Sequence, residues 1–457
     1  MNKHNKWWVL LVTMAATGLV FLDNTIMPVS LPTIQREMNL SGTGLVWVVN
    51  SYLLTLMTLM IIGGKLYDLF GMRNTYFVGL TIFGLGSIIG GLSYATWSLI
   101  AGRVIQGAGG ALLIPTTGAL FIELFPAGKR ARAIGINTGL SSIFMMLGPV
   151  VGGFLTEYLS WRFIFWVNLP IVIFGLAMVY WLLSPGEKKK GSFHFTGAIT
   201  LSLAIVLFVV ALMEGERWHW SSPLTLSFFA ASIALLFTFI LTSRRNDHPL
   251  LDLSIFKQPL FFHANLAIFI TQFLLMVNVL WAIYFQNELN FSPARTGVLI
   301  VLASLPVLIF APIGGYLADR FGFRLPMSLG FISLVFSLLW LTIFASRGSI
   351  AILLPGLIPF GCGVTMILSP GFAAALSNVS PEKLGSASGM TTSLRQLAAT
   401  LGIALMSGIY YTVYANTHSF QSAFKVVSLF AAGLSLFGLL LVLFLFNQKA
   451  TCTVREK

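Results

Sequence analysis

The sequence predicts an all-α membrane protein with fourteen transmembrane helices, arranged as two six-helix halves with an inserted central helix pair. Three observations predict this class. Hydrophobic residues make up 57% of the 457-residue chain and charged residues 9%, against about 45–50% and about 25% in soluble proteins. Long apolar runs recur along the chain, and one ten-residue pattern occurs twice. A soluble fold cannot bury that much apolar surface, so the chain is expected to cross a bilayer many times.

Fourteen apolar runs approach the roughly 20 residues that a helix needs to span a bilayer. The runs of the first half cover residues 7–28, 45–63, 75–94, 98–122, 133–155 and 163–183. Two further runs, 196–213 and 224–241, form the inserted pair. The runs of the second half cover residues 262–284, 297–316, 326–345, 350–370, 386–411 and 424–446. The connections are short, so we expect no soluble domain.

These runs divide the chain into three parts. Residues 1–184 form the N-terminal six-helix half, and residues 185–258 form a basic linker with the inserted hairpin. Residues 259–457 form the C-terminal half with a short cytoplasmic tail. The first run is too long for the core of a signal peptide, so we expect it to be retained as the first span.

The net charge of +13 is spread over short loops and not gathered in one patch. This pattern is typical of topology signals and does not favour nucleic-acid binding. On the side of the two termini the loops and tails hold nineteen Lys and Arg residues, and the opposite loops hold six. Because cytoplasmic loops retain basic residues, we expect both termini in the cytoplasm.

The repeated pattern, G-x-L-x-D-x-F-G-x-R, occupies residues 64–73 and 315–324. Each copy follows a span that runs from outside to inside. Glycine permits a tight turn, and the Asp can accept hydrogen bonds from a helix N-terminus or from the loop Arg. We expect the two loops to act as a latch for one conformation of a two-state carrier, the alternative being a plain turn. The expected latch residues are Gly64, Asp68, Gly71, Arg73, Gly315, Asp319, Gly322 and Arg324.

Asp23 is the acidic residue that lies deepest in a predicted span, about five residues or roughly 8 Å from the outer end of the first. A carboxylate there is costly and indicates a functional site. Two interpretations stay open and are compatible with each other. Asp23 either carries a proton that drives transport, or forms a fixed ion pair with Arg103, which lies at a similar depth in the fourth span.

Arg395 lies roughly 15 Å inside the thirteenth predicted span. It either binds an anionic substrate group, pairs across the halves with Asp23, or is satisfied by helix carbonyls and water. The ninth span carries a polar and aromatic mixture that suits a largely apolar substrate cavity with a few polar anchors, although packing is the alternative. The candidate substrate contacts in that span are Gln272, Asn278, Trp281, Tyr284 and Gln286.

In the fifth span, Gly148 and Pro149 are followed by Gly152 and Gly153. Proline has no N–H and weakens the hydrogen-bond ladder of a helix. This segment is therefore either a conformational hinge or a packing kink.

The loop pattern also resembles the loop motif of the major facilitator superfamily. F-L-D-N-T-I at 21–26 with L-P at 31–32 resembles the first-span motif of its fourteen-span drug:proton antiporter family. R-V-I-Q-G at 103–107, G-P-V-V-G-G at 148–153 and W-R-F-I-F at 161–165 resemble its fourth-, fifth- and sixth-span motifs. Pro28 and Phe144 depart from these motifs. The resemblance implies alternating access and the export of lipophilic, often cationic, compounds in exchange for protons, which is multidrug efflux from a bacterial inner membrane.

The residues themselves show neither a phosphate-binding G-x-x-x-x-G-K-[ST] sequence nor a zinc-binding H-E-x-x-H sequence. We therefore expect no enzyme activity, no metal and no cofactor, with a proton gradient as the energy source. The expected partners are a small-molecule substrate, protons and the bilayer, and the chain is expected to function as a monomer. Two alternatives stay open. The first is a dedicated exporter of one metabolite, siderophore or lipid, whose cargo could be anionic or zwitterionic. The second is a non-transporting receptor or scaffold.

Overall fold

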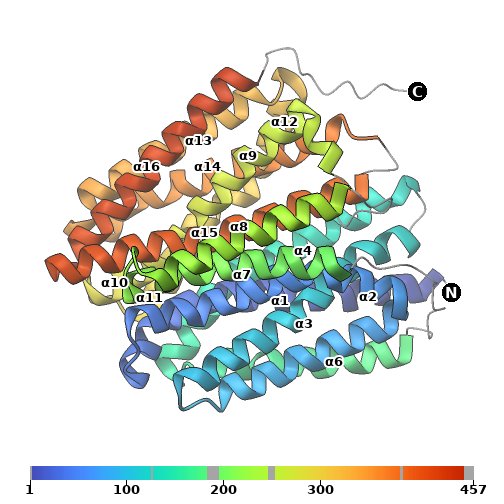
Figure 1. Cartoon of the computed structure of the whole chain (residues 1–457), viewed down its shortest axis with the longest axis horizontal. Coiled ribbons are helices and arrows are strands. Elements are labelled where there is room, and N and C mark those ends of the chain that lie inside the picture. The colour runs from blue at the N-terminus through green and yellow to red at the C-terminus, as the bar shows by residue number, and fades with distance from the viewer. Residues whose placement is uncertain (1–2, 125–126, 183–194, 245–252, 381–383, 447–457) are drawn as a thin grey trace. The chain divides into compact units, whose positions relative to one another are not determined.

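The computed structural model describes residues 3–124, 127–182, 195–244, 253–380 and 384–446, and these residues contain sixteen α-helices, two short 3-10 helices and no strand (Figure 1). The prediction of an all-α protein is confirmed. The first half comprises α1 (Lys3–Met38), α2 (Gly42–Gly91), α3 (Thr96–Leu124), α4 (Ala127–Tyr158), α5 (Phe163–Trp166) and α6 (Asn168–Leu182). The inserted pair is α7 (Phe195–Trp218) and α8 (Pro223–Arg244).

The second half begins with the 3-10 helix η1 (Leu253–Lys257) and includes a second one, η2 (Ala345–Arg347). Its α-helices are α9 (Pro259–Leu275), α10 (Val277–Asn287), α11 (Pro293–Ser304), α12 (Pro306–Phe321), α13 (Arg324–Phe344), α14 (Ile350–Ser377), α15 (Leu384–Thr417) and α16 (Phe420–Leu445).

Thirteen helical segments of the described chain are long and apolar enough to cross a membrane. The remaining predicted span, the fifth, corresponds to α4, whose described part includes the shorter apolar stretch Ile143–Tyr158. The fourteen predicted spans therefore agree with the helices of the structure.

The boundaries of several predicted spans differ from the helices. The second and third spans are merged in α2, and the ninth is divided between α9 and α10 at Met276. The tenth is divided at Leu305, because Pro306 cannot donate a backbone hydrogen bond. Several helices are longer than predicted, among them α1, which continues to Met38, α7, which continues to Trp218, and α14, which continues to Ser377.

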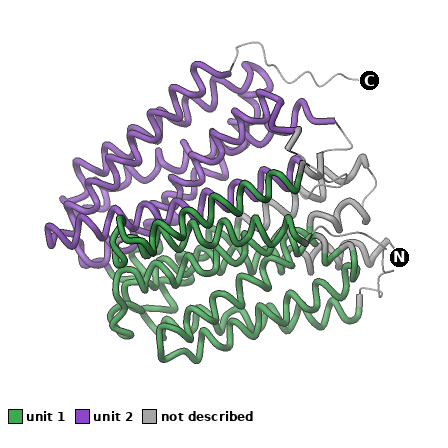
Figure 2. Tube along the Cα trace, in the orientation of Figure 1, with its two compact units in different colours: residues 1–250, 292–297 green, residues 251–291, 298–457 purple. Residues whose placement is uncertain are grey.

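The chain forms two compact units, which Figure 2 distinguishes by colour. The first unit comprises residues 1–250 and 292–297, and so includes α7 and α8. The second comprises residues 251–291 and 298–457.

Within the first unit, α2 and α3 approach closely because glycines face backbone atoms of the partner helix. A Cβ at Gly86 would meet the backbone of Gln106, and one at Gly109 would meet the backbone of Phe83. Small residues at helix contacts let backbones of membrane helices approach in this way. The approach brings the polar side chains of α2 within reach of those of α3.

The inserted helix α7 is attached to α2 by polar contacts at successive levels. The indole Nε1 of Trp47 donates to Glu214 Oε1 at 2.6 Å. Ser202 Oγ donates to the carbonyl of Thr58 at 3.0 Å. In the second unit, Trp340 Nε1 on α13 donates to the carbonyl of Ile352 on α14 at 2.8 Å.

The two copies of the repeated pattern adopt the same turn. Gly71 has φ 75° and ψ 168°, and Gly322 has φ 80° and ψ 168°. This region of backbone space is essentially restricted to glycine. The repeat in the sequence therefore corresponds to a repeat in backbone geometry.

We expect Gly71→Ala and Gly322→Ala each to lower the free energy of unfolding by about 1–3 kcal/mol, because a Cβ is strained in this conformation. Gly315→Ala is the matched control, since Gly315 has no atom within 4 Å of a Cβ position and no positive φ. Thermal unfolding in detergent measures all three variants. Equal melting temperatures would contradict the assignment.

Candidate functional site: a buried ion pair and its donors

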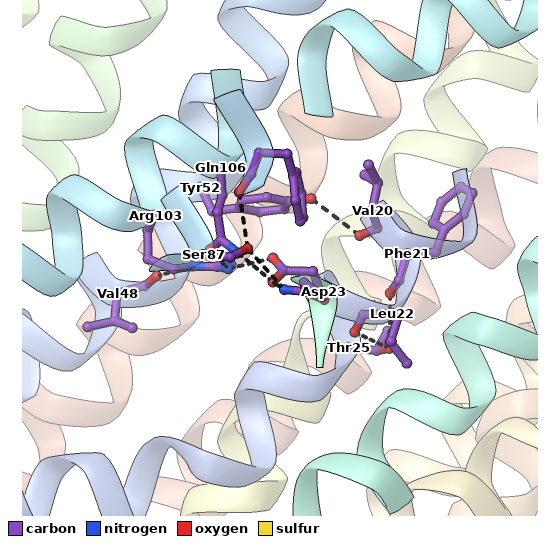
Figure 3. A network of polar contacts seen from close by, with 12 residues as sticks. Val20, Phe21, Leu22, Asp23, Thr25, Val48, Tyr52, Ser87, Arg103 and Gln106 are labelled. Atoms are coloured by element: carbon purple, nitrogen blue, oxygen red, sulfur yellow. Dashed lines mark hydrogen bonds and ion pairs between the residues drawn. The ribbon is translucent and has the colours of Figure 1, made fainter. Parts of the chain in front are cut away.

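Asp23 on α1 and Arg103 on α3 form an ion pair inside the first unit (Figure 3). Arg103 NH1 lies 2.5 Å from Asp23 Oδ2, and each side chain is only 1% exposed. Removing two charges from water carries a penalty of several kcal/mol per ion unless further hydrogen bonds satisfy them. The remaining atoms of both groups therefore need partners.

Two amide side chains complete the shell of the carboxylate. Gln106 Nε2 donates to Asp23 Oδ1 at 3.0 Å, and Asn168 Nδ2 donates to the same oxygen at 3.1 Å. Gln106 also accepts from Arg103 NH1 at 2.9 Å, and Arg103 Nε donates to the carbonyl of Val48 at 3.1 Å. Arg103 and Gln106 lie three positions apart, on one face of α3. Asp23 thus receives three donors from two other helices.

Ser87 and Tyr52, both on α2, support these groups from the side. Ser87 Oγ accepts from Gln106 at 2.9 Å and donates to the carbonyl of Phe83 at 3.0 Å. The guanidinium of Arg103 lies 4.2 Å from the ring centroid of Tyr52, a cation–π contact. Ser87 and Tyr52 are fully buried. The network is therefore shielded from solvent in this conformation.

The network depends chemically on the charge of Asp23. An ionised carboxylate can accept the hydrogen bonds of all three donors. A protonated carboxyl group has no charge to pair with Arg103, and its O–H is itself a donor. Protonation would leave Arg103 as a buried charge with only neutral partners. A single proton at Asp23 thus changes the energy of contacts among α1, α2, α3 and α6.

The structure places Asp23 and Arg103 together, as the sequence suggested, but at a different depth. Because α1 runs to Met38, Asp23 lies well inside the segment Met14–Met38 and not within a few residues of its C-terminal end. Glu214 is a second buried acid of the described helices, at 8% exposed, and it lies at the end of the span Thr196–Gly215 because α7 extends beyond residue 213.

Sequence reasoning missed the roles of Gln106, Asn168, Ser87 and Tyr52. Gln106 had a detectable signal, since it follows Arg103 by one helical turn inside an apolar run. Ser87 and Tyr52 had none, because serine and tyrosine are common in membrane helices.

The candidate substrate residues lie in the second unit. Gln272 is on α9, and Asn278, Trp281, Tyr284 and Gln286 are on α10. Trp281 and Tyr284 are completely buried, and the Tyr284 ring stacks on Phe424 with centroids 4.1 Å apart.

Arg395, on α15, lies in the same unit, with its guanidinium 5.8 Å from the ring centroid of Phe372. Its Nε has no hydrogen-bond partner among the residues that the structure describes. The carboxylate of Asp23, to which the sequence offered Arg395 as one partner, takes its donors from the first unit.

The predicted latch is described only in part. The side chain of Asp68 lies outside the described residues, whereas Asp319 is exposed. Arg73 lies with its guanidinium 5.3 Å from the ring centroid of Tyr180. Gly64 and Arg324 are half-buried, near the turns formed by Gly71 and Gly322. The latch role of these loops stays a prediction.

At the predicted hinge, α4 continues as a helix through Gly148 and Pro149. A Cβ at Gly152 would meet the carbonyl of Ile26 on α1, and one at Gly153 would meet the carbonyl of Pro293 at the start of α11. Glycine at these positions permits close packing, which is one of the two interpretations that the sequence left open.

Comparison with known proteins decides the family. The model of the Major Facilitator Superfamily matches residues 13–275 and 260–457. The chain belongs to the major facilitator superfamily. Its fold agrees, because the crystal structure of a D-xylose-proton symporter superposes with a TM-score of 0.70 at 14% identity, over 97% of this chain and 99% of that one.

Several relatives within the major facilitator superfamily are named for drug resistance or transport. The chain is 35% identical to the multidrug resistance protein Stp of Mycobacterium tuberculosis, over 87% of this chain and 75% of that one. It is 30% identical to the tetracenomycin C resistance and export protein of Streptomyces glaucescens, over 88% and 75%. The riboflavin transporter RibZ of Clostridioides difficile is 28% identical, over 97% and 98%. The chain is therefore a multi-pass membrane transporter, as the sequence motifs implied.

We expect Arg103→Met to lower the free energy of unfolding by about 3–5 kcal/mol, because it leaves the carboxylate of Asp23 buried without its counter-charge. Adding Asp23→Asn to that variant removes the uncompensated charge and should restore part of the loss. Thermal unfolding in detergent of the wild type, both single variants and the double variant measures the coupling. Strictly additive effects would show that the two charges do not interact.

Proposed function

We propose that this protein is a proton-coupled exporter of lipophilic, drug-like small molecules that works by alternating access. The observation that supports the proposal most is the Asp23–Arg103 ion pair with its amide donors, inside a transporter of the major facilitator superfamily. The names of relatives such as Stp and the tetracenomycin C exporter support drug-like cargo. The cargo moves outward, and protons move inward.

Coupling follows from the energetics of the buried pair. In the ionised state, Asp23 holds Arg103 and the amides of Gln106 and Asn168, which stabilises the arrangement of the four helices described here. A proton that reaches Asp23 weakens this arrangement and shifts the population toward a second conformation. Release of the proton on the other side restores the pair. The energy difference between the two states depends on the charge of Asp23, so one group that gains and loses a proton is sufficient to shift their populations.

The proposed setting is a cytoplasmic membrane, with both termini inside and the chain functioning as a monomer. The support for orientation is the excess of basic residues, nineteen against six, on the side of the termini. No cofactor takes part, and the proton gradient supplies the energy.

A dedicated exporter of one compound is the second candidate. The similarity to the riboflavin transporter RibZ extends over 97% of the chain, more than the similarity to Stp at 87%. Arg395 also favours a cargo with an anionic or zwitterionic group, since its guanidinium has no acidic partner among the described residues. A panel of cargo compounds in the vesicle assay below separates one substrate from many.

We expect Asp23→Asn to abolish accumulation of cargo in inverted vesicles under an imposed pH gradient, because the amide cannot take up and release a proton. Asp23→Glu should keep part of the activity, since the titrating group survives. Glu214→Gln is the matched control, because it removes the other buried acid of the described helices, outside the network. If Asp23→Asn still responds to the gradient and Glu214→Gln does not, the proton pathway runs through α7.

The orientation is tested by cysteine labelling in a chain whose Cys362 and Cys452 are replaced by serine. A cysteine at Ser221, between α7 and α8, should react with an impermeant thiol reagent added to intact cells. One at Gly191, in the basic linker, should react only after the cytoplasmic side is opened. The reverse pattern would place both termini outside.

A further inference from the structure

Three aromatic side chains of the second unit bury polar atoms that have no partner. Trp281 Nε1, Tyr284 Oη and Tyr410 Oη make no hydrogen bond with any residue that the structure describes, and all three side chains are 0% exposed. A buried donor left without a partner costs about 1–3 kcal/mol, and native proteins contain few. Three such donors close together therefore call for an explanation.

The three groups belong to neighbouring helices. Trp281 and Tyr284 lie one turn apart on α10, and Tyr410 lies on α15, which contacts α10. Tyr284 and Tyr410 are close enough to interact electrostatically, and Glu288 at the end of α10 interacts with both. Glu288 is half-buried, and no hydrogen bond joins it to either hydroxyl.

The rings of Tyr284 and Trp281 are fully buried and pack against other aromatic side chains. Tyr284 stacks on Phe424 at 4.1 Å between centroids, and Trp281 packs against Phe360 at 4.8 Å. A lipophilic cation would need an open ring face for a cation–π contact. The groups that remain unpaired are the N–H and O–H at the polar edges of the rings, and each of these can donate a hydrogen bond.

Three other buried aromatic donors of the described chain are satisfied, whereas the hydroxyl of Tyr411, next to Tyr410 on α15, is also without a partner. Trp340 Nε1 donates to the carbonyl of Ile352 at 2.8 Å, and Trp161 Nε1 donates to Glu37 at 2.7 Å. The Tyr76 hydroxyl bonds to Thr117. Among the buried tryptophan and tyrosine donors named here, those without a partner lie on α10 and α15.

We propose that Trp281, Tyr284 and Tyr410 form a donor subsite that binds carbonyl, carboxylate or phenolate oxygens of an aromatic cargo, and that this subsite is closed in the present conformation. The inference rests on the proposed transport function and narrows its substrate class to acceptor-bearing neutral or anionic ring systems. Arg395, also on α15, gives the same unit a positive charge suited to such cargo. Cargo oxygens remove the penalty of the three unpaired donors when the site opens.

The test uses Tyr284→Phe and Tyr410→Phe, which remove only the hydroxyl groups. Each should raise the melting temperature of the ligand-free protein, because an unsatisfied buried group is lost. Each should also weaken the binding of riboflavin and of fluorescein by about five- to tenfold, the value of one hydrogen bond. Quenching of the fluorescence of each compound on the purified full-length protein measures affinity.

Two matched controls separate the subsite from a structural effect. Tyr76→Phe removes a satisfied hydroxyl, so it should lower the melting temperature and leave both affinities unchanged. Trp281→Phe should weaken binding of the two ring compounds, whereas Trp340→Phe, whose indole bonds to Ile352, should not. Tetraphenylphosphonium, a lipophilic cation without acceptor atoms, should bind all variants equally.

The inference is overturned if neither ring compound binds the wild type, or if the Tyr→Phe variants bind both as tightly as the wild type does. It is also overturned if tetraphenylphosphonium loses affinity in those variants, which would make the cluster a cation site beside Glu288. Either result leaves gradient-driven export of cationic cargo intact. Loss of the export function would be seen separately, as a wild type that accumulates no compound in the vesicle assay.

Discussion

The ion pair between α1 and α3 requires hydrogen-bond partners from the helices around it, because buried charges have lost their contacts with water. The carboxylate of Asp23 takes amides from α3 and α6, and Arg103 takes a carbonyl and a ring face from α2. Glycines let α2 and α3 come close enough for these contacts. Apolar side chains in place of a buried pair are often equally stable or more stable. Stability alone therefore does not account for the pair, which is consistent with the proton coupling proposed above.

The ion pair of the first unit and the aromatic cluster of the second differ in how their polar atoms are satisfied. In the first, the carboxylate and guanidinium are surrounded by donors and acceptors within 3.1 Å. In the second, Trp281, Tyr284 and Tyr410 are packed without partners. A satisfied network specifies one arrangement, and an unsatisfied group favours whichever state supplies a partner. The proposed proton site and the proposed cargo subsite therefore lie in different parts of the chain.

The spans, the repeat and the two buried charges were predictable because each depends on local sequence. A run of about 20 apolar residues is sufficient for a span, and an Asp or Arg inside one is conspicuous. Ser87 and Asn168 were not predictable as ligands of the network, because linear order does not show which helix faces meet. The sequence predicts a span that ends at Met213, because polar residues follow it, but α7 continues to Trp218 and Glu214 contacts Trp47 on α2. The composition of the ninth span indicates Trp281 and Tyr284 as candidates, but that their polar edges are unpaired depends on the packing of α10 against α15.

The attachment of α7 to α2 also limits how the chain can be shortened. Excising the inserted pair to leave twelve spans would remove Glu214 and Ser202, the partners of the indole N–H of Trp47 and of the carbonyl of Thr58, and in a membrane helix lost polar partners are not readily replaced by water. Asn50, which donates to Met213 Sδ at 2.9 Å, would lose its contact as well. A twelve-span descendant of this protein would need apolar substitutions along that face of α2 before it lost the pair.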